Sequence, residues 1–109
     1  MPLIGYTGSL NEVPLSTASA ALMGLTRAVA MENGNEKIRA NAVAIPLVDS
    51  KSFYKIYTED KIKKLKDNIP LGEICLPEDV VGPIIFLASH KSDYITGEIM
   101  IVSGGSYTQ

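Results

Sequence analysis

The segment PEDVVGPIIFLASHKSDYITGEIMIVSGG, residues 77–105, contains a helix, a strand and a glycine stop in close succession. Pro77 fits the first helical position, and the two acidic residues after it lie in the positive first turn of that helix. We expect Pro83 to kink the helix, because its ring removes a backbone donor. A strand follows over residues 98–102, and a glycine pair ends it. The helix is predicted to bury the apolar residues Val80, Val81, Ile84, Ile85 and Leu87.

Residues 16–31 predict an earlier and longer helix. Its apolar positions recur at steps of four, three and four, which is a helical stripe. The stripe consists of Ala18, Leu22, Leu25 and Val29. Asn33 and Gly34 supply the end of the helix. The preceding residues 1–14, with two prolines and two glycines, predict a loop.

Residues 38–48 predict a strand. Small and apolar residues first alternate with polar ones and then run together, as in a strand that is buried in a parallel sheet. Residues 52–68 are rich in lysine and predict one or two amphipathic helices, with Ile56, Ile62 and Leu65 turned inward. The order helix, strand, helical segment, helix, strand predicts an α/β fold with parallel strands. Two strands do not form a stable sheet unaided, so we expect the domain to be incomplete.

The composition describes one small globular domain. The chain has 109 residues, 46% of them apolar and 20% charged, with a formal net charge of -2. This balance argues against nucleic acid or a membrane as a partner, and no apolar run reaches the roughly 20 residues that span a bilayer. Cys75 is the only cysteine, which excludes an internal disulfide and predicts a cytoplasmic protein. One cysteine and one histidine, His90, are too few for a His/Cys metal cluster, so we expect no metal site.

Three stretches together resemble one enzyme family. Residues 21–30 (ALMGLTRAVA), 38–44 (IRANAVA) and 77–105 closely resemble the C-terminal half of short-chain dehydrogenases/reductases, which are NAD(P)-dependent oxidoreductases. The similarity runs over about residues 4–105, with matching order and spacing. It implies a partial Rossmann-type doubly wound fold, in which parallel strands pack with helices. Residues 1–109 are then expected to be one truncated domain, without the glycine-rich N-terminal half that holds the cofactor's pyrophosphate in the family.

The positions that carry the family's chemistry hold unreactive residues in this chain. In the family a tyrosine exchanges a proton with the substrate oxygen, a lysine four residues later lowers the pKa of that tyrosine, and an upstream serine orients the carbonyl. Aligned without gaps, these three positions are Leu15, Ser19 and Pro2. Leucine and proline have no proton to give, and serine carries no positive charge. We therefore assign no catalytic residue to this chain.

Two residues after the strand predicted over 38–48 match positions that contact the cofactor in the family. The resemblance implies that the backbone of Val48 contacts the nicotinamide carboxamide and that the hydroxyl of Ser50 contacts the cofactor phosphates. Where relatives usually have Pro-Gly, this chain has Ile45 and Pro46. The family's cofactor is NAD or NADP. The alternative interpretation is an ordinary loop without a ligand.

A literal Tyr-x-x-x-Lys sequence runs from Tyr57 to Lys61. In a helix its two side chains would share one face. It falls in the segment that covers the substrate in the family, away from the catalytic helix, and we interpret it as coincidence. We interpret the lysine run over residues 61–66 as a solvated helix face, and Cys75 as buried filler.

Three functions are open at this point. The first is a non-catalytic relative that acts through assembly, as a homo-oligomer or with an intact relative. The resemblance implies contacts through the helix at 16–31 and through residues 77–105, and a half fold exposes apolar surface. The second is a subunit of an active NAD(P)-dependent oxidoreductase that another chain completes, with Tyr6 or Tyr57 as a replacement acid or base. The third is a fragment whose parent was a working reductase, with no substrate indicated.

Overall fold

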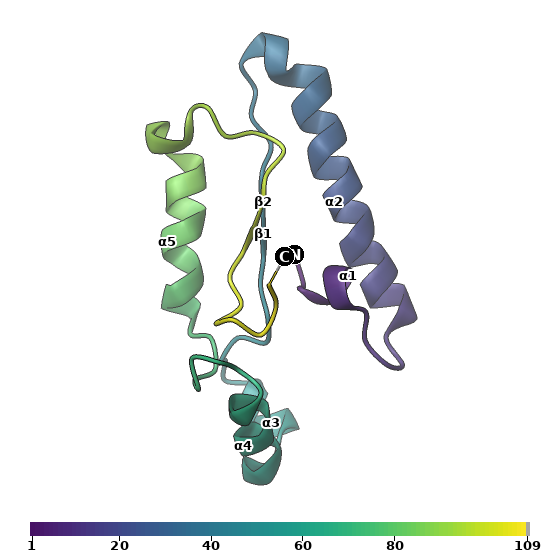
Figure 1. Ribbon diagram of the computed structural model, residues 1–109, viewed down its shortest axis with the longest axis vertical. Helices are drawn as coiled ribbons and strands as arrows, with labels where there is room; N and C mark the ends of the chain where they lie inside the picture. Colours follow the sequence, from purple (N-terminus) through teal and green to yellow (C-terminus); the bar gives the residue numbers. More distant parts are fainter. Residues whose placement is uncertain (109) are drawn as a thin grey trace.

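The computed structural model describes residues 1–108 and has three layers (Figure 1). α2 (Val13–Asn33) covers one face of a central sheet, and α5 (Pro77–Ala88) covers the other. In the sheet, β1 (Ala42–Ala44) pairs in parallel with β2 (Ile99–Ile101). The shorter elements are α1 (Ile4–Thr7), η1 (Gly34–Glu36), α3 (Phe53–Ile56), α4 (Glu59–Asp67) and η2 (His90–Ser92). The predicted α/β architecture with parallel strands is confirmed.

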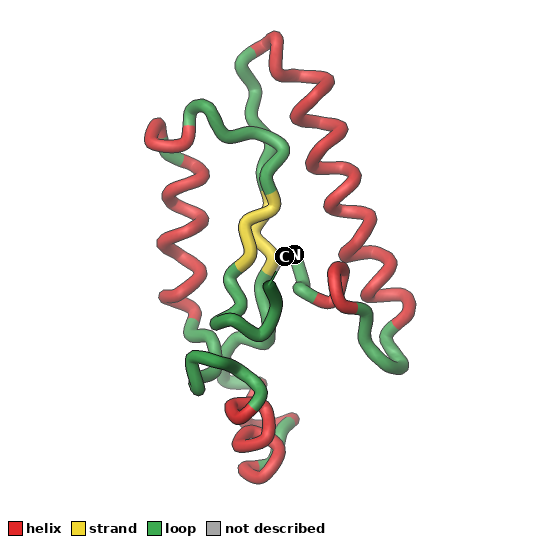
Figure 2. Tube along the Cα trace, in the orientation of Figure 1, coloured by secondary structure: helices red, strands yellow, loops and turns green. Residues whose placement is uncertain are grey.

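Only short lengths of the sheet are regular strand, as Figure 2 shows. β1 and β2 each pair over three residues, beginning with Ala42 opposite Ile99. The strands predicted over residues 38–48 and 98–102 are therefore too long. Just before β1, the side chains of Arg39 and Asn41 make hydrogen bonds to backbone groups that a longer ladder would pair with each other.

Residues 1–3 run beside β1 as an outer strand. The α-amino group of Met1 donates to a carbonyl of β1 at 2.7 Å. The N–H of Leu3 donates to the carbonyl of Ile45 at 2.8 Å, and Pro2 forms a parallel bridge with Ile45. The order in space is therefore residues 1–3, β1 and β2.

The core lies between the sheet and α2. It is built on Leu3, Ala44 and Ile99, which are all buried. Met23 of α2 and Tyr107 of the C-terminal segment pack against these three. Successive residues of a strand face opposite sides, so the alanines of β1 leave room for α2 to approach the sheet closely.

α2 turns a different face to the sheet from the one its apolar stripe predicts. Ser19 and Ala30 are buried, and Met23 contacts the core. Leu22 and Leu25 of the predicted stripe are exposed, Leu25 by 58%. The prediction of a buried stripe is wrong, because small side chains fit the close contact with the alanine-lined sheet and large ones do not.

α5 buries only one side. Val80 and Leu87 are buried, as predicted, and Pro83 lies inside the helix, which runs on to Ala88. The prediction fails for the other three apolar residues, each exposed by at least 50%: Val81, Ile84 and Ile85. A helix that covers one face of a sheet buries only the side that faces the sheet. When such a helix is apolar on more than one side, its remaining apolar residues are exposed.

Two further segments differ from their predictions. Residues 1–14 are not a loop throughout, because they include α1 and the first two residues of α2, where Pro14 occupies an early helical position. Residues 52–68 do form two helices, α3 and α4. The inward residue of α3 is Phe53, which is buried, whereas Ile56 is 72% exposed.

Two polar side chains before β1 fasten α5 and β2 to the sheet. The Arg39 guanidinium donates to the carbonyls of Leu87 at 3.0 Å and Ile95 at 3.1 Å. The Asn41 amide donates to the carbonyl of Ile95 at 2.9 Å, and its oxygen accepts the N–H of Glu98 at 3.0 Å. Arg39 also places a cation at the negative, C-terminal end of α5. These bonds fix the amino end of the sheet.

Candidate functional site

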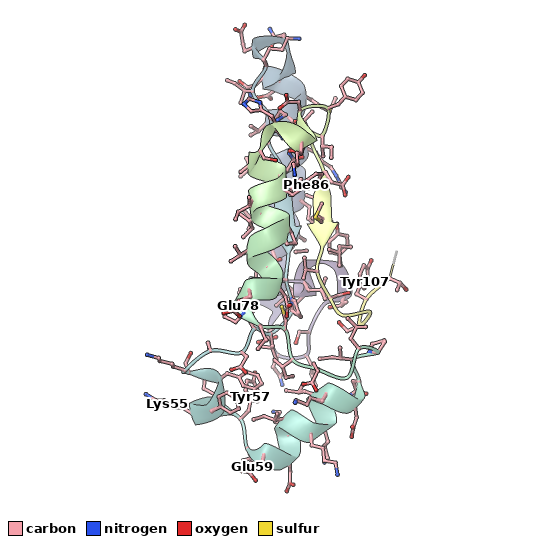
Figure 3. All side chains as sticks on the ribbon, turned by 90° about the vertical axis from the view of Figure 1, so that its left-hand side faces the viewer. Lys55, Tyr57, Glu59, Glu78, Phe86 and Tyr107 are labelled. Carbon is pink, nitrogen blue, oxygen red and sulfur yellow. The ribbon has the colours of Figure 1, made fainter. Side chains whose placement is uncertain are left out.

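The carboxyl ends of β1 and β2 lie at the same edge of the sheet, because the strands are parallel. α3 and α4 lie beyond that edge. Figure 3 shows them below the start of α5 at Glu78, with Lys55 on α3 and Glu59 at the start of α4. Ligands of open α/β sheets bind outside the carboxyl ends of the strands. This edge is therefore the candidate site.

Two of the three positions that the resemblance matches to the family's catalytic residues, Pro2 and Ser19, pack against each other, whereas Leu15 does not join them. Ser19 is 1% exposed, and its Oγ donates to the carbonyl oxygen of Pro2 at 2.5 Å. Leu15, one turn earlier on α2, is 48% exposed. The structure thus brings Ser19 and Pro2 together, and the hydroxyl of this pair is committed to a backbone carbonyl. Leucine and proline carry no exchangeable side-chain proton, and the proton of the Ser19 hydroxyl is directed to the Pro2 carbonyl.

Gly5 of α1 closes the space around Ser19. A side-chain carbon added at Gly5 would lie 2.7 Å from Ser19 Oγ and 2.9 Å from the backbone nitrogen of Ala20. Real contacts are never that short, so the two helices touch backbone to backbone at this point. A side chain longer than serine at position 19 would displace α1.

The two predicted cofactor-contact residues follow β1. Val48 forms a parallel bridge with Cys75, in which the N–H of Asp49 donates to the Cys75 carbonyl at 2.8 Å. In such a bridge the bonds go to the flanking residues, so the backbone groups of Val48 point away from Cys75. Ser50 is exposed, and its Oγ lies 3.1 Å from the Oγ of Ser52. Both residues lie at the candidate edge, and their contact with a cofactor stays a prediction.

Two polar pairs hold the segment of α3 and α4, and sequence reasoning missed both. The Tyr54 phenol donates to Asp49 Oδ2 at 2.7 Å, and Lys66 Nζ lies 2.8 Å from Glu73 Oε2. The hydrogen bond to Asp49 raises the pKa of Tyr54, which makes the phenol a weaker acid.

The two tyrosines considered as replacement acids make aromatic contacts. Lys61 Nζ lies 5.3 Å from the centroid of the Tyr57 ring, a cation–π contact, and the Phe53 ring lies 5.0 Å from the same ring. The Tyr6 ring lies 5.2 Å from the ring of Tyr107. Tyr57 and Tyr6 are therefore both packed against neighbours in the fold.

Cys75 is half-buried, whereas the sequence predicted a buried residue. Burial, and then the charge of Asp79, raise the pKa of its thiol, which lowers the fraction present as the reactive thiolate. Within residues 1–108, no three His, Cys, Asp or Glu side chains are grouped to hold a metal ion. No helix in the same range is long and apolar enough to cross a membrane.

A family model described as enoyl-(acyl carrier protein) reductase matches residues 5–107. The chain belongs to the short-chain dehydrogenase/reductase family. It is 35% identical over 105 residues to a 3-oxoacyl-(acyl-carrier-protein) reductase of Aquifex aeolicus, covering 96% of this chain and 42% of that protein. It is 37% identical over 105 residues to a 2-dehydro-3-deoxy-D-gluconate 5-dehydrogenase of Dickeya dadantii, covering 94% of this chain and 41% of that one.

A mouse relative has a third activity in its name. The chain is 37% identical over 106 residues to a (3R)-3-hydroxyacyl-CoA dehydrogenase of Mus musculus, covering 96% of this chain and 40% of that protein. The chain thus spans about two fifths of the length of the curated relatives that it matches. These matches confirm the predicted resemblance to a C-terminal portion of the short-chain dehydrogenase/reductase fold.

Proposed function

We propose that this short-chain dehydrogenase/reductase relative does not catalyse on its own and acts through assembly. The observation that carries the proposal is the contact between Ser19 and Pro2, in which the serine hydroxyl donates to a backbone carbonyl. Reduction of a carbonyl needs a proton on the oxygen as well as a hydride on the carbon. Neither this hydroxyl nor the neighbouring Leu15 supplies that proton.

An exposed apolar face of α2 supports the assembly part of the proposal. Leu15, Leu22 and Leu25 are exposed along this helix. A side-chain carbon added at Gly24 would meet nothing within 4 Å, so a second helix has room to approach closely. Contiguous exposed apolar patches of this kind are typical of protein interfaces.

The other face of the molecule is also apolar. α5 leaves Ile84 and Ile85 exposed. A groove of about 480 Å³ runs between α5 and β1, and its apolar lining includes Met1, Val43, Ile45, Val80, Ile84 and Leu87. Because both outer helices carry such surface, a second copy of this chain offers matching partners for either one, and a symmetric dimer covers the same face on both copies. An intact relative is the other partner proposed.

Sedimentation velocity over a dilution series tests the assembly. We expect the wild-type chain to sediment as a dimer or larger species and to lose helical circular dichroism as dilution separates the subunits. The variant L22E/L25E should sediment as a monomer. The matched control I56E places the same charge at an exposed isoleucine of α3 and should behave as wild type. A wild-type monomer that unfolds cooperatively at every concentration contradicts the proposal.

A second candidate function is a subunit of an active NAD(P)-dependent oxidoreductase that another chain completes. The limited coverage of the relatives supports it, as does the Val48 backbone, whose polar groups point away from Cys75. NAD or NADP would then contact Val48 and Ser50. Titration with NADPH followed by fluorescence tests this candidate, since S50A should weaken binding, and S9A, at an exposed serine before α2, should not. The third alternative, a fragment of a working reductase, predicts neither nucleotide binding nor a defined oligomer.

The composition supports two further parts of the proposal. A single cysteine fits a cytoplasmic location. The net charge of -2 argues against nucleic acid and anionic membranes as partners.

A further inference from the structure

A hollow of about 610 Å³ lies at the amino end of the sheet, opposite the candidate site. Its walls come from the turn after α2, residues 34–39, and from the turn after α5, residues 90–96. These two turns lead into β1 and β2, and they lie at the upper end of Figure 1. Ligand pockets of proteins have volumes of roughly 300–1,000 Å³, so this hollow has the size of a small-molecule site.

The hollow carries an excess of positive charge. Lys37 and Arg39 are cations, His90 becomes one when protonated, and Asp93 is the acid among the lining residues. Asp93 Oδ1 lies 3.4 Å from His90 Nδ1, so this acid is already paired. Within residues 1–108, neither Lys37 nor Arg39 forms an ion pair with a carboxylate. These two cations are therefore uncompensated, although the chain as a whole has a formal net charge of -2.

Lys37 has a backbone conformation that residues with a side chain rarely adopt. Its φ is 60°, in the left-handed region that favours glycine. The turn after α2 requires this conformation, because the N–H of Lys37 donates to the carbonyl of Gly34 at 3.0 Å and the next N–H donates to the carbonyl of Asn33 at 3.3 Å. Glycine would satisfy the same turn with less strain. The lysine therefore costs stability, and strained residues of this kind cluster at ligand sites.

Two further side chains of the hollow are open to a ligand. Tyr94 is fully exposed, so its ring offers a flat surface on which another ring can stack. Thr96 Oγ1 accepts the N–H of Ala40 at 3.1 Å, and its own O–H is left to donate to a ligand. The hollow thus combines cations, a hydroxyl donor and an aromatic face.

We propose that this hollow binds a small phosphate monoester that carries a flat ring. The phosphate lies against Lys37, whose ammonium binds it as a point charge, with the Arg39 charge and the Thr96 hydroxyl beside it. The ring stacks on Tyr94. The site lies at the opposite end of the sheet from the predicted cofactor contacts, so it is separate from them. It also does not depend on the assembly proposed above.

An NMR titration of the isotopically labelled chain with phenyl phosphate and with inorganic phosphate tests the site. We expect phenyl phosphate to shift the amide signals of Lys37 and Thr96 saturably and to bind several-fold more tightly than inorganic phosphate. The amide signals of Val48 and Ser50, at the candidate site, should stay unchanged. Y94L should remove the advantage of the ring. Equal binding of the two phosphates to the wild type would overturn the assignment of the ring, and the absence of saturable shifts at Lys37 and Thr96 would overturn the site.

K37G and N11G form a matched pair of variants. Asn11 also has a positive φ, 63°, and it precedes α2, whereas the hollow follows that helix. Both exchanges place glycine at a left-handed residue, but only K37G removes a cation from the hollow. We expect K37G to bind both phosphates several-fold more weakly than the wild type, N11G to bind them equally well, and K37G to unfold at no lower urea concentration than the wild type. A K37G chain that binds as tightly as the wild type, or one that is less stable, would overturn the proposal.

Discussion

The amino end and the carboxyl end of the sheet are held by different kinds of contact in this chain. At the amino end, Arg39 holds the carbonyls of Leu87 and Ile95 and so joins α5 to the segment that leads into β2. At the carboxyl end, Ser19 and Pro2 occupy positions of catalysis in relatives and make a packing contact instead. The difference teaches that long polar side chains fasten the amino end of this sheet, whereas a close contact between small residues fills its carboxyl end.

Loss of the Arg39 hydrogen bonds at the amino end of the sheet should have the largest effect on the free energy of unfolding. R39A leaves carbonyls at the end of α5 and before β2 without their charged donor, which should lower the free energy of unfolding by about 3 kcal/mol. The free energy of unfolding of R39K should lie between those of R39A and the wild type, because an ammonium does not reproduce the forked geometry of the guanidinium donors. Urea denaturation checks both. K37A, an exposed change two residues away, is the control, and an R39A midpoint equal to that of K37A would contradict the assigned role.

Restoration of the family's lysine should come next. S19K puts a long cation where Gly5 leaves no space, and overpacking of this kind should cost about 2 kcal/mol. L15Y, at a half-exposed position, is the control and should be nearly neutral. Urea denaturation measures both. An S19K chain as stable as wild type would show that the carboxyl end is still open enough to hold the family's lysine.

The parts that the sequence predicts are those set by local patterns. The long helix, the helix at Pro77 and the two helices over residues 52–68 follow from periodicity and helix-start residues, and their order predicts parallel strands. The buried face of α2 does not follow, because Leu22 and Leu25 look like core residues until the close contact of Ser19 with the outer strand is known.

The candidate site is predicted only in part. The resemblance gives the positions of Pro2, Leu15 and Ser19, but only the fold shows that two of them touch. The Tyr54–Asp49 bond connects residues five apart across the start of α3, a spacing that has no signature in sequence. A long polar side chain at the end of a short helix can reach several hydrogen-bond partners. The conformation of the turn between the two helices determines which partner it contacts.

The thiol of Cys75 should titrate above its usual range. Burial and the charge of Asp79 raise its pKa, so alkylation by iodoacetamide should reach half its maximal rate at a higher pH than for a free cysteine. D79N removes the negative charge and should move that midpoint downward. Mass spectrometry of the alkylated chain over a pH series gives both midpoints, with unfolded protein as the reference. A midpoint at or below the unfolded value would contradict the raised pKa.

The smallest effect is expected at the Lys66–Glu73 pair. The hydrogen bond and charge of Glu73 raise the pKa of Lys66. Because the folded pKa is the higher one, this stabilisation is complete at neutral pH and is lost as the pH rises through the folded pKa of Lys66. E73Q should therefore be slightly less stable than wild type at neutral pH and low salt, and equal to it in high salt or strong alkali. Thermal unfolding compares it with E32Q on α2, and a deficit that ignores salt would contradict the ion pair.

Native mass spectrometry of the purified chain, with and without excess NADH and NADPH, tests the central claim most directly. A chain whose catalytic positions have become packing contacts should appear as a dimer or larger assembly with no bound nucleotide. A species that carries stoichiometric nucleotide would contradict this account, because Val48, Ser50 and their neighbours would then form a working cofactor site.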